Sequence, residues 1–176
     1  MKKIIFLGMQ GSGKSTQAKK LASDLGLQYV EMGQLLRDRS QEGDQVANTI
    51  KQALSQGKLV ENQITIDCLS EKLKQPGFEK GYVLDGYPRN KSQLEQLDTD
   101  ITKVFYINVS DHEAVKRLSS RGRHDDKPDL IQKRIDIYHS QTEPLLEYFR
   151  GLGILEEING EQSISAVGMD IANKIH

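Results

Sequence analysis

The run Gly8-Met9-Gln10-Gly11-Ser12-Gly13-Lys14-Ser15-Thr16 decides the fold of this 176-residue chain. It fits the pattern G-x-x-x-x-G-K-[ST], in which glycines let backbone amides converge on a phosphate and the lysine reaches the outer phosphates. The apolar run 4–7 precedes it, and apolar residues at helical spacing follow over 15–25. The sequence therefore predicts a phosphate-binding loop between a first strand and a first helix, with the Ser15 hydroxyl available to hold Mg2+.

The rest of the chain alternates short apolar runs with helical patterns. Further strands are expected at 27–30, 82–84, 103–109 and 154–158, and further helices at 111–120, 128–149 and 164–175. Such alternation is typical of a parallel sheet covered on both faces, and ligands bind at the carboxyl ends of its strands. We expect an α/β three-layer fold with a five-stranded parallel sheet, formed as one domain over 1–176.

The polar helical stretch 34–74 is too long for a simple crossover between two strands. We expect 31–75 to project from the sheet as a helical insert that binds substrate. A helical layer lying on the sheet is the alternative.

Composition excludes several classes of protein. The net charge of −1 argues against a nucleic-acid protein held by phosphate attraction over its whole surface. No apolar run approaches the length of a membrane span or a secretory signal, so we expect no membrane association and a cytoplasmic location. The single cysteine, Cys68, cannot form an internal disulfide or a multi-thiolate zinc site, and it falls among apolar residues at helical spacing.

Asp85 and a set of arginines extend the predicted phosphate site. Asp85 follows the strand 82–84, where a carboxylate can orient Mg2+ or its waters. No Asp-x-x-Gly occurs, and Asn90-Lys91-Ser92-Gln93 lacks the aspartate of a guanine-binding motif. The grouped arginines instead suit two polyphosphates that meet, because guanidinium forks neutralise charge in phosphoryl transfer. These arginines are Arg37, Arg89, Arg117, Arg121, Arg123 and Arg134.

At this point the chain resembles the adenylate kinases, within the nucleoside monophosphate kinases. The resemblance covers nearly the whole chain. Its most specific part is the block 85–89, Asp-Gly-Tyr-Pro-Arg, and the other matching segments are 8–16, 32–37, 57–60, 123–126 and 134–144. It implies reversible phosphoryl transfer from MgATP to AMP, giving two ADP.

The resemblance also implies two subsites. The expected ATP-binding residues are Gly11, Ser12, Gly13, Lys14, Ser15, Thr16, Arg117, Arg121 and, through the backbone near it, Gln162. The expected AMP-binding residues are Met32, Arg37, Lys58, Leu59, Val60, Gly86, Tyr87, Pro88, Arg89, Gln93, Arg123 and Arg134, with Gln93 on the adenine edge. The expected catalytic residues are Lys14, Arg89, Arg121, Arg123 and Arg134. Ser15 and Asp85 are expected to hold Mg2+, directly or through water.

The chain departs from the family pattern at several positions. Gln10 and Ser15 replace the usual proline and glycine of the loop. Met32 and Gln34 replace a hydroxyl residue and an aspartate. Only Gly122 separates Arg121 from Arg123, so 121–126 is expected to be a truncated lid without zinc, and the insert is expected to supply most of the closure over the site.

Two other functions stay open from the sequence. Asn90 and the loss of a hydroxyl at Met32 favour a UMP or CMP kinase of the same family, whereas Gln93 opposes it. The short lid also allows a regulatory module that binds ATP and turns over poorly, although both arginine sets are retained. We expect ATP and AMP as the ligands and a monomeric enzyme.

Overall fold

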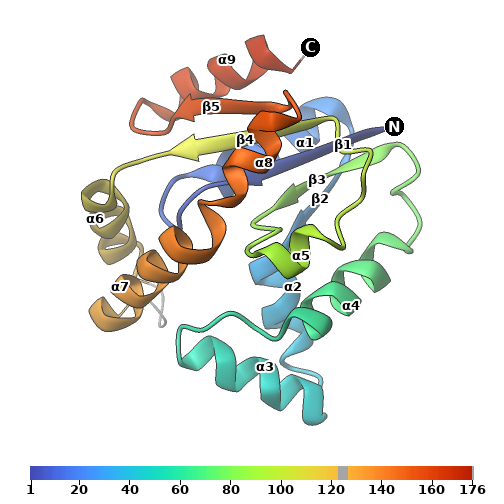
Figure 1. Ribbon diagram of the computed structural model, residues 1–176, viewed down its shortest axis with the longest axis vertical. Coiled ribbons are helices and arrows are strands. Elements are labelled where there is room, and N and C mark those ends of the chain that lie inside the picture. The colour runs from blue at the N-terminus through green and yellow to red at the C-terminus, as the bar shows by residue number, and fades with distance from the viewer. Residues whose placement is uncertain (123–126, 176) are drawn as a thin grey trace.

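The computed structural model describes residues 1–122 and 127–175. Five parallel strands form one sheet in the order β2-β3-β1-β4-β5. The strands are β1 (Lys2–Leu7), β2 (Gln28–Glu31), β3 (Gly81–Asp85), β4 (Lys103–Asn108) and β5 (Leu155–Asn159). The predicted three-layer α/β fold and its five strands are confirmed, and β1 lies at the centre of the sheet (Figure 1).

Helices cover both faces because the central strand is apolar on both sides. Ile4 and Phe6 belong to a core that includes α1 (Lys14–Leu25) and α9 (Ile164–Lys174). Ile5 and Leu7 belong to the larger core on the other face. Alternate residues of a strand point to opposite faces, so four consecutive apolar residues fill both cores.

The larger core is built by the remaining helices. These are α2 (Met32–Arg39), α3 (Gln45–Ser55), α4 (Asn62–Leu73), α5 (Lys91–Leu94), α6 (Asp111–Arg121), α7 (Pro128–Ile137) and α8 (Leu145–Gly151). Helix α3 packs against α2 and lies away from the sheet (Figure 1).

The expected helix over 128–149 is interrupted in the structure. A π-helical turn, η1 (Tyr138–Thr142), separates α7 from α8. Pro144 has no amide hydrogen, and its ring would clash with the carbonyl four residues earlier in a regular helix. The chain therefore widens and restarts at Leu145, which brings Thr142 toward the loop after β3.

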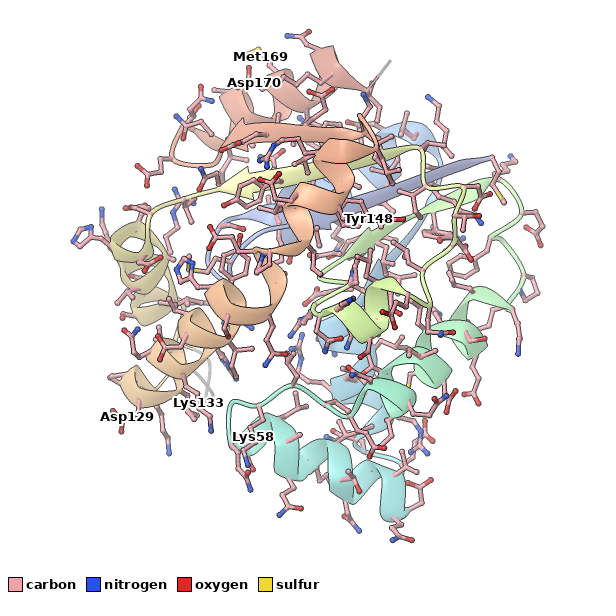
Figure 2. The ribbon with its side chains drawn as sticks, in the orientation of Figure 1. Lys58, Asp129, Lys133, Tyr148, Met169 and Asp170 are labelled. Carbon is pink, nitrogen blue, oxygen red and sulfur yellow. The ribbon has the colours of Figure 1, made fainter. Side chains whose placement is uncertain are left out.

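The residues that follow the carboxyl end of α3 contact α7. Lys133 Nζ donates to the Gln56 carbonyl at 2.7 Å, and the backbone at Gly57 lies against Leu130. Figure 2 shows Lys133 and Lys58 beside this junction. The insert is therefore fastened to the helix that follows the short 121–126 segment.

Candidate active site

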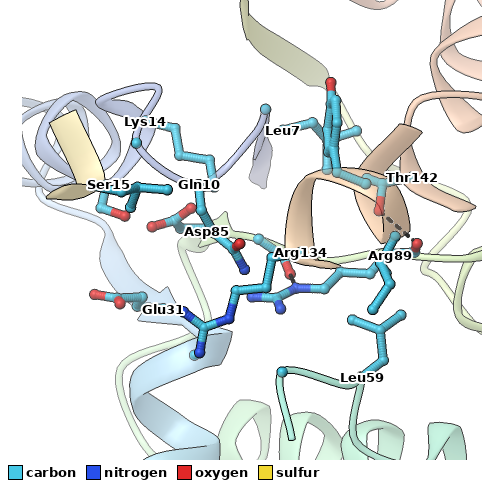
Figure 3. A pocket seen from close by; sticks show the side chains of 18 of the residues that line it. Leu7, Gln10, Lys14, Ser15, Glu31, Leu59, Asp85, Arg89, Arg134 and Thr142 are labelled. Carbon is cyan, nitrogen blue, oxygen red and sulfur yellow. Dashed lines mark hydrogen bonds between the residues drawn. The ribbon is translucent and has the colours of Figure 1, made fainter. Parts of the chain in front are cut away.

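A pocket of about 390 Å³ opens at the carboxyl ends of β1, β2 and β3. Its walls come from the phosphate-binding loop, from α2, from the α3–α4 connection and from α6, α7 and η1. Seven cationic residues of the part of the chain that the structure describes line it: Lys14, Arg37, Lys58, Arg89, Arg117, Arg121 and Arg134. Two carboxylates, Glu31 and Asp85, line it as well. Figure 3 shows Lys14, Ser15, Asp85 and Glu31 on one side of the pocket and Arg89 entering from the other.

The phosphate-binding loop is formed by backbone that only glycine tolerates. Gly11 has φ +84°, and a Cβ there would lie 2.8 Å from the Ala114 carbonyl oxygen. The loop is thus pressed against α6. Helix α1 starts directly after it at Lys14, so the unpaired amides of its first turn face the pocket.

Lys14 is held over the loop from which it comes. Its Nζ donates to the Met9 carbonyl at 3.2 Å. Desolvation lowers the pKa of Lys14, and the Asp85 carboxylate opposes that change. A phosphate should stabilise this poorly hydrated ammonium group strongly, because its charge replaces the hydration that the group has lost.

Arg117 fastens three segments together at the loop. Its Nε donates to Glu113 at 2.7 Å, Nη1 to the Ser12 carbonyl at 3.3 Å and Nη2 to the Gly160 carbonyl at 3.0 Å. The guanidinium is therefore held against the phosphate-binding loop, α6 and the turn after β5. One face of a fixed planar cation is a suitable surface for a base to stack on.

Asp85 has the character of a metal-binding carboxylate. It is 1% exposed, and its Oδ2 accepts from the Tyr29 hydroxyl at 3.0 Å. Its Oδ1 is buried and has no hydrogen-bond partner among the residues that the structure describes. An orphaned carboxylate oxygen beside the Ser15 hydroxyl in the same pocket fits Mg2+ or its waters, since that ion prefers oxygen ligands. Within 1–122 and 127–175, no group of three or more His, Cys, Asp or Glu could hold a metal by itself.

Arg89 is fixed by three neighbours before any ligand arrives. Its Nε donates to the Gly86 carbonyl at 2.8 Å, its amide donates to Gln93 Oε1 at 2.8 Å, and its carbonyl accepts from Thr142 Oγ1 at 2.7 Å. Burial is the main factor that lowers its pKa, and Arg134 and Arg37 lower it further. The three guanidinium groups therefore repel one another, and a phosphate between them would relieve that repulsion.

Gly86 leaves the space in which the Arg89 side chain lies. Its φ is +75°, and a Cβ there would approach Arg89 Nη2 at 3.2 Å and the Lys14 side chain at 4.0 Å. The lack of a side chain at Gly86 therefore allows the Arg89 guanidinium its position at the end of β3.

Several predicted site residues line the pocket directly. These are Gly11, Gly13, Lys14, Ser15, Thr16, Arg37, Lys58, Leu59, Asp85, Gly86, Pro88, Arg89, Arg117, Arg121 and Arg134. Arg123, a predicted catalytic and AMP-binding residue, lies outside the described residues, as does most of the predicted lid 121–126.

Other predicted residues are buried behind the pocket wall. Met32, Val60 and Tyr87 are core residues, and Ser12 is 1% exposed. Gln93 is also 1% exposed, and its amide nitrogen donates to Asn62 Oδ1 at 3.1 Å.

Gln162 lies at the surface. Its side chain donates to Asp170 at 2.8 Å and to the Asn159 carbonyl at 3.2 Å. The side chain thus turns toward α9 and is not part of the pocket lining.

Sequence patterns missed several residues of the site, among them Glu31, Tyr29 and Thr142. Glu31 lines the pocket, Tyr29 holds Asp85, and Thr142 holds the Arg89 carbonyl. Glu31 stands opposite Asp85 in the β2–β3 register, so the end of the predicted strand 27–30 carried a signal that could have found it. Thr142 carried none, because its contact depends on the π-helical turn.

Comparison with known proteins agrees with this geometry. The sequence model of the family described as adenylate kinase matches residues 6–154. The chain is 35% identical to an adenylate kinase of Prochlorococcus marinus (strain MIT 9515), over 99% of this chain and 98% of that one. It is 39% identical to an adenylate kinase of Mycobacterium bovis (strain BCG / Pasteur 1173P2), over 84% of this chain and 86% of that one.

A third relative is longer. An adenylate kinase of Dehalococcoides mccartyi (strain ATCC BAA-2266 / KCTC 15142 / 195) is 34% identical over an alignment of 212 positions, which covers 99% of this chain and 98% of that one. Because this chain has 176 residues, the alignment must contain insertions in the relative. The family match over most of the chain, and the relatives that it covers nearly end to end, show that this chain belongs to the adenylate kinase family.

Proposed function

We propose that this protein transfers the terminal phosphoryl group of MgATP to AMP and runs the reaction reversibly, giving two ADP. One observation carries the proposal: the phosphate-binding loop with Lys14 opens into the same pocket as Arg37 and Arg89, which come from α2 and the loop after β3. A protein that binds one nucleotide needs only one of these two groups of cations. Transfer between two nucleotides needs both groups.

The donor nucleotide is assigned to the phosphate-binding loop. Backbone amides of 11–16 would surround its phosphates, with Lys14 on the outer ones and Arg117 beside its base. Ser15 and Asp85 would hold Mg2+, which neutralises phosphate charge when bound. The orphaned Asp85 Oδ1 supports that assignment.

The acceptor is assigned to the opposite wall. Arg37 and Arg89 would hold the AMP phosphate, and Lys58 and Leu59 border the space for its nucleoside. Gln93 is proposed as the adenine reader. Its Nε2 donates to Asn62 and its Oε1 accepts from the Arg89 amide, so the base would use the second hydrogen and the second lone pair or displace these contacts. An amide can match adenine with one donor and one acceptor, which supports this role.

Transfer then requires little covalent chemistry from the protein. An oxygen of the AMP phosphate attacks the terminal phosphorus of ATP, and the bond from that phosphorus to the bridging oxygen breaks, leaving ADP on each side. Arg89, Arg121 and Arg134 converge on the space between the two walls and would stabilise the charge as it moves. Arg123 is proposed to join them.

We also propose that the insert 31–75 and the short lid 121–126 act within a single domain, and that the enzyme works as a monomer in the cytoplasm. Among the described residues, no helix is both long enough and apolar enough to span a bilayer.

A panel of acceptors tests the proposal. Purified protein is incubated with MgATP and AMP, dAMP, UMP, CMP or GMP, and the nucleoside diphosphates are separated and measured. We expect rapid ADP formation with AMP and at least about 10-fold lower kcat/KM with the pyrimidine and guanine acceptors. Faster turnover of UMP or CMP would assign the protein to a different kinase activity in the same family.

A further inference from the structure

Glu31 is an acidic residue in a pocket lined mainly by cations. It ends β2, lies beside Asp85 in the strand register, and keeps 26% of its side chain exposed. No role in substrate binding follows for it from the phosphate-binding motif or from the arginine pattern. Glu31 does, however, contact Arg37, which is assigned to the acceptor phosphate.

Arg37 is occupied on both of its bidentate edges. Gln34 Oε1 accepts from Arg37 Nε at 3.2 Å and from Nη2 at 2.9 Å. Glu31 Oε1 accepts from the same Nη2 at 3.0 Å. A guanidinium binds phosphate through parallel donors along the Nε–Nη2 or the Nη1–Nη2 edge, and Nη2 belongs to both. A phosphate that takes either edge must therefore displace an acceptor already present.

Glu31 is the acceptor that a phosphate most resembles. It carries a full negative charge on planar oxygens, whereas Gln34 is neutral. Its other oxygen is held weakly: the Tyr29 hydroxyl lies 3.4 Å from Oε2 and 3.0 Å from Asp85 Oδ2. The pair of Glu31 with Arg37 is about one-third exposed, and ion pairs of that kind are weak enough for a doubly charged ligand to break.

We propose that Glu31 tunes the affinity of the acceptor subsite: it occupies Arg37 in the free protein as an internal competitor of the acceptor phosphate and so weakens AMP binding. A phosphate that binds along the Nη1–Nη2 edge of Arg37 must displace this carboxylate. A nucleoside that lacks the phosphate does not need Arg37 and therefore does not meet this competition. The inference rests on the proposed function, because it takes Arg37 as a ligand of the AMP phosphate.

The test is a binding measurement without ATP or metal, so that no turnover occurs. Isothermal titration compares AMP with adenosine, which lacks the phosphate, for the wild type and for Glu31→Gln. The substitution keeps the shape of the side chain and removes its charge. We expect the Kd for AMP to fall by about 3- to 10-fold and the Kd for adenosine to stay unchanged. Glu31→Ser, which removes the acceptor group as well, should shift AMP in the same direction.

Glu42→Gln is the matched control. Glu42 Oε2 pairs with Arg39 at 3.2 Å next to the same helix, but neither residue lines the pocket. This variant removes an equal charge and should leave the Kd for AMP within about 2-fold of the wild type.

Unchanged or weaker AMP binding in both Glu31 variants, at wild-type melting temperature, would overturn the inference. An equal gain for AMP and adenosine would overturn it too, because the effect would then not act on the phosphate. Failure of the wild type to make ADP from ATP and AMP would instead contradict the proposed function, and the binding assay separates that result from the role of Glu31.

Discussion

The two walls of the pocket are built in different ways. The donor wall is a backbone structure: a glycine loop pressed onto α6, an amino-terminal turn of α1, and Arg117 bound to carbonyl groups of Ser12 and Gly160. The acceptor wall includes a cluster of side chains held by other side chains, in which Arg37 lies between Glu31 and Gln34. A backbone cradle changes little with sequence outside its motif, whereas a side-chain cluster can be retuned by a single substitution.

The largest effect is expected at the donor wall. Lys14→Met should lower kcat by about 100-fold or more, because it removes the point charge that meets the outer phosphates while leaving the loop in place. Steady-state ADP formation and thermal melting check this together. Lys19→Met, at an exposed position of the same helix, serves as the control. Turnover of Lys14→Met within 10-fold of the wild type would contradict the role given to the loop.

Arg89→Ala should be nearly as damaging, although Arg89 belongs to the acceptor wall. Its guanidinium lies where the two phosphates would meet, so it should bind the transition state more strongly than either substrate. We expect kcat to fall by about 100-fold, measured beside the exposed Arg150→Ala. A variant that raises only the KM for AMP would show that Arg89 binds substrate and transition state equally.

Gln93→Leu should have a smaller effect and should reduce the preference among acceptors. The lost paired hydrogen bonds to adenine should lower discrimination for AMP by about 10-fold. The substitution also leaves the Arg89 amide and Asn62 without their present partner, so the melting temperature should fall. Asn62→Ala removes the contacts of Asn62 with Gln93 and Asn90 but keeps the Gln93 amide, and it is the matched comparison. An unchanged ranking of acceptors would move base recognition to the 58–60 segment.

The smallest effect concerns pH and lies outside the pocket. His139 contacts Glu143 at 2.7 Å and Asp111 at 2.9 Å, and these hydrogen bonds raise its pKa above the ordinary value of 6.5. Because the folded-state pKa is raised, the stabilisation is fully present below about pH 6.5 and is lost as pH rises through the folded-state pKa.

The effect of His139 should be modest because its partners are about half exposed. His139→Asn should lower the free energy of unfolding by about 0.5 kcal/mol at pH 5.5 and by less at pH 9, as measured by denaturant titration. An equal loss of unfolding free energy at pH 5.5 and pH 9 would show that the imidazolium charge is not what holds α6 to the π-helical turn.

Sequence reasoning predicted the donor wall better than the acceptor wall. The phosphate-binding loop, Asp85 and the ends of the strands follow from local patterns and from the rule that ligands bind at the carboxyl ends of parallel strands. Glu31 was missed because its contact with Arg37 depends on how α2 leaves β2. Thr142 was missed because helical spacing over 128–149 cannot show where the helix widens, although Pro144 indicated a break nearby.

Gln162 shows a different limit. The resemblance assigned the backbone near Gln162, after Asn159 and Gly160, to the ATP site. The side chain of Gln162 bonds to Asp170 on α9, and the role of that backbone stays a prediction. A resemblance locates a segment, while the direction of each side chain depends on the packing around it.

The most direct measurement follows the terminal phosphoryl group itself. ATP labelled at its terminal phosphate is mixed with the protein in the presence and absence of AMP, and the label is traced to ADP and to inorganic phosphate. We predict that AMP sends nearly all the label into ADP, because both walls hold their nucleotides in one pocket that the α3–α7 contact at Lys133 helps to close. Label released as inorganic phosphate at the same rate with and without AMP would contradict transfer between the two walls.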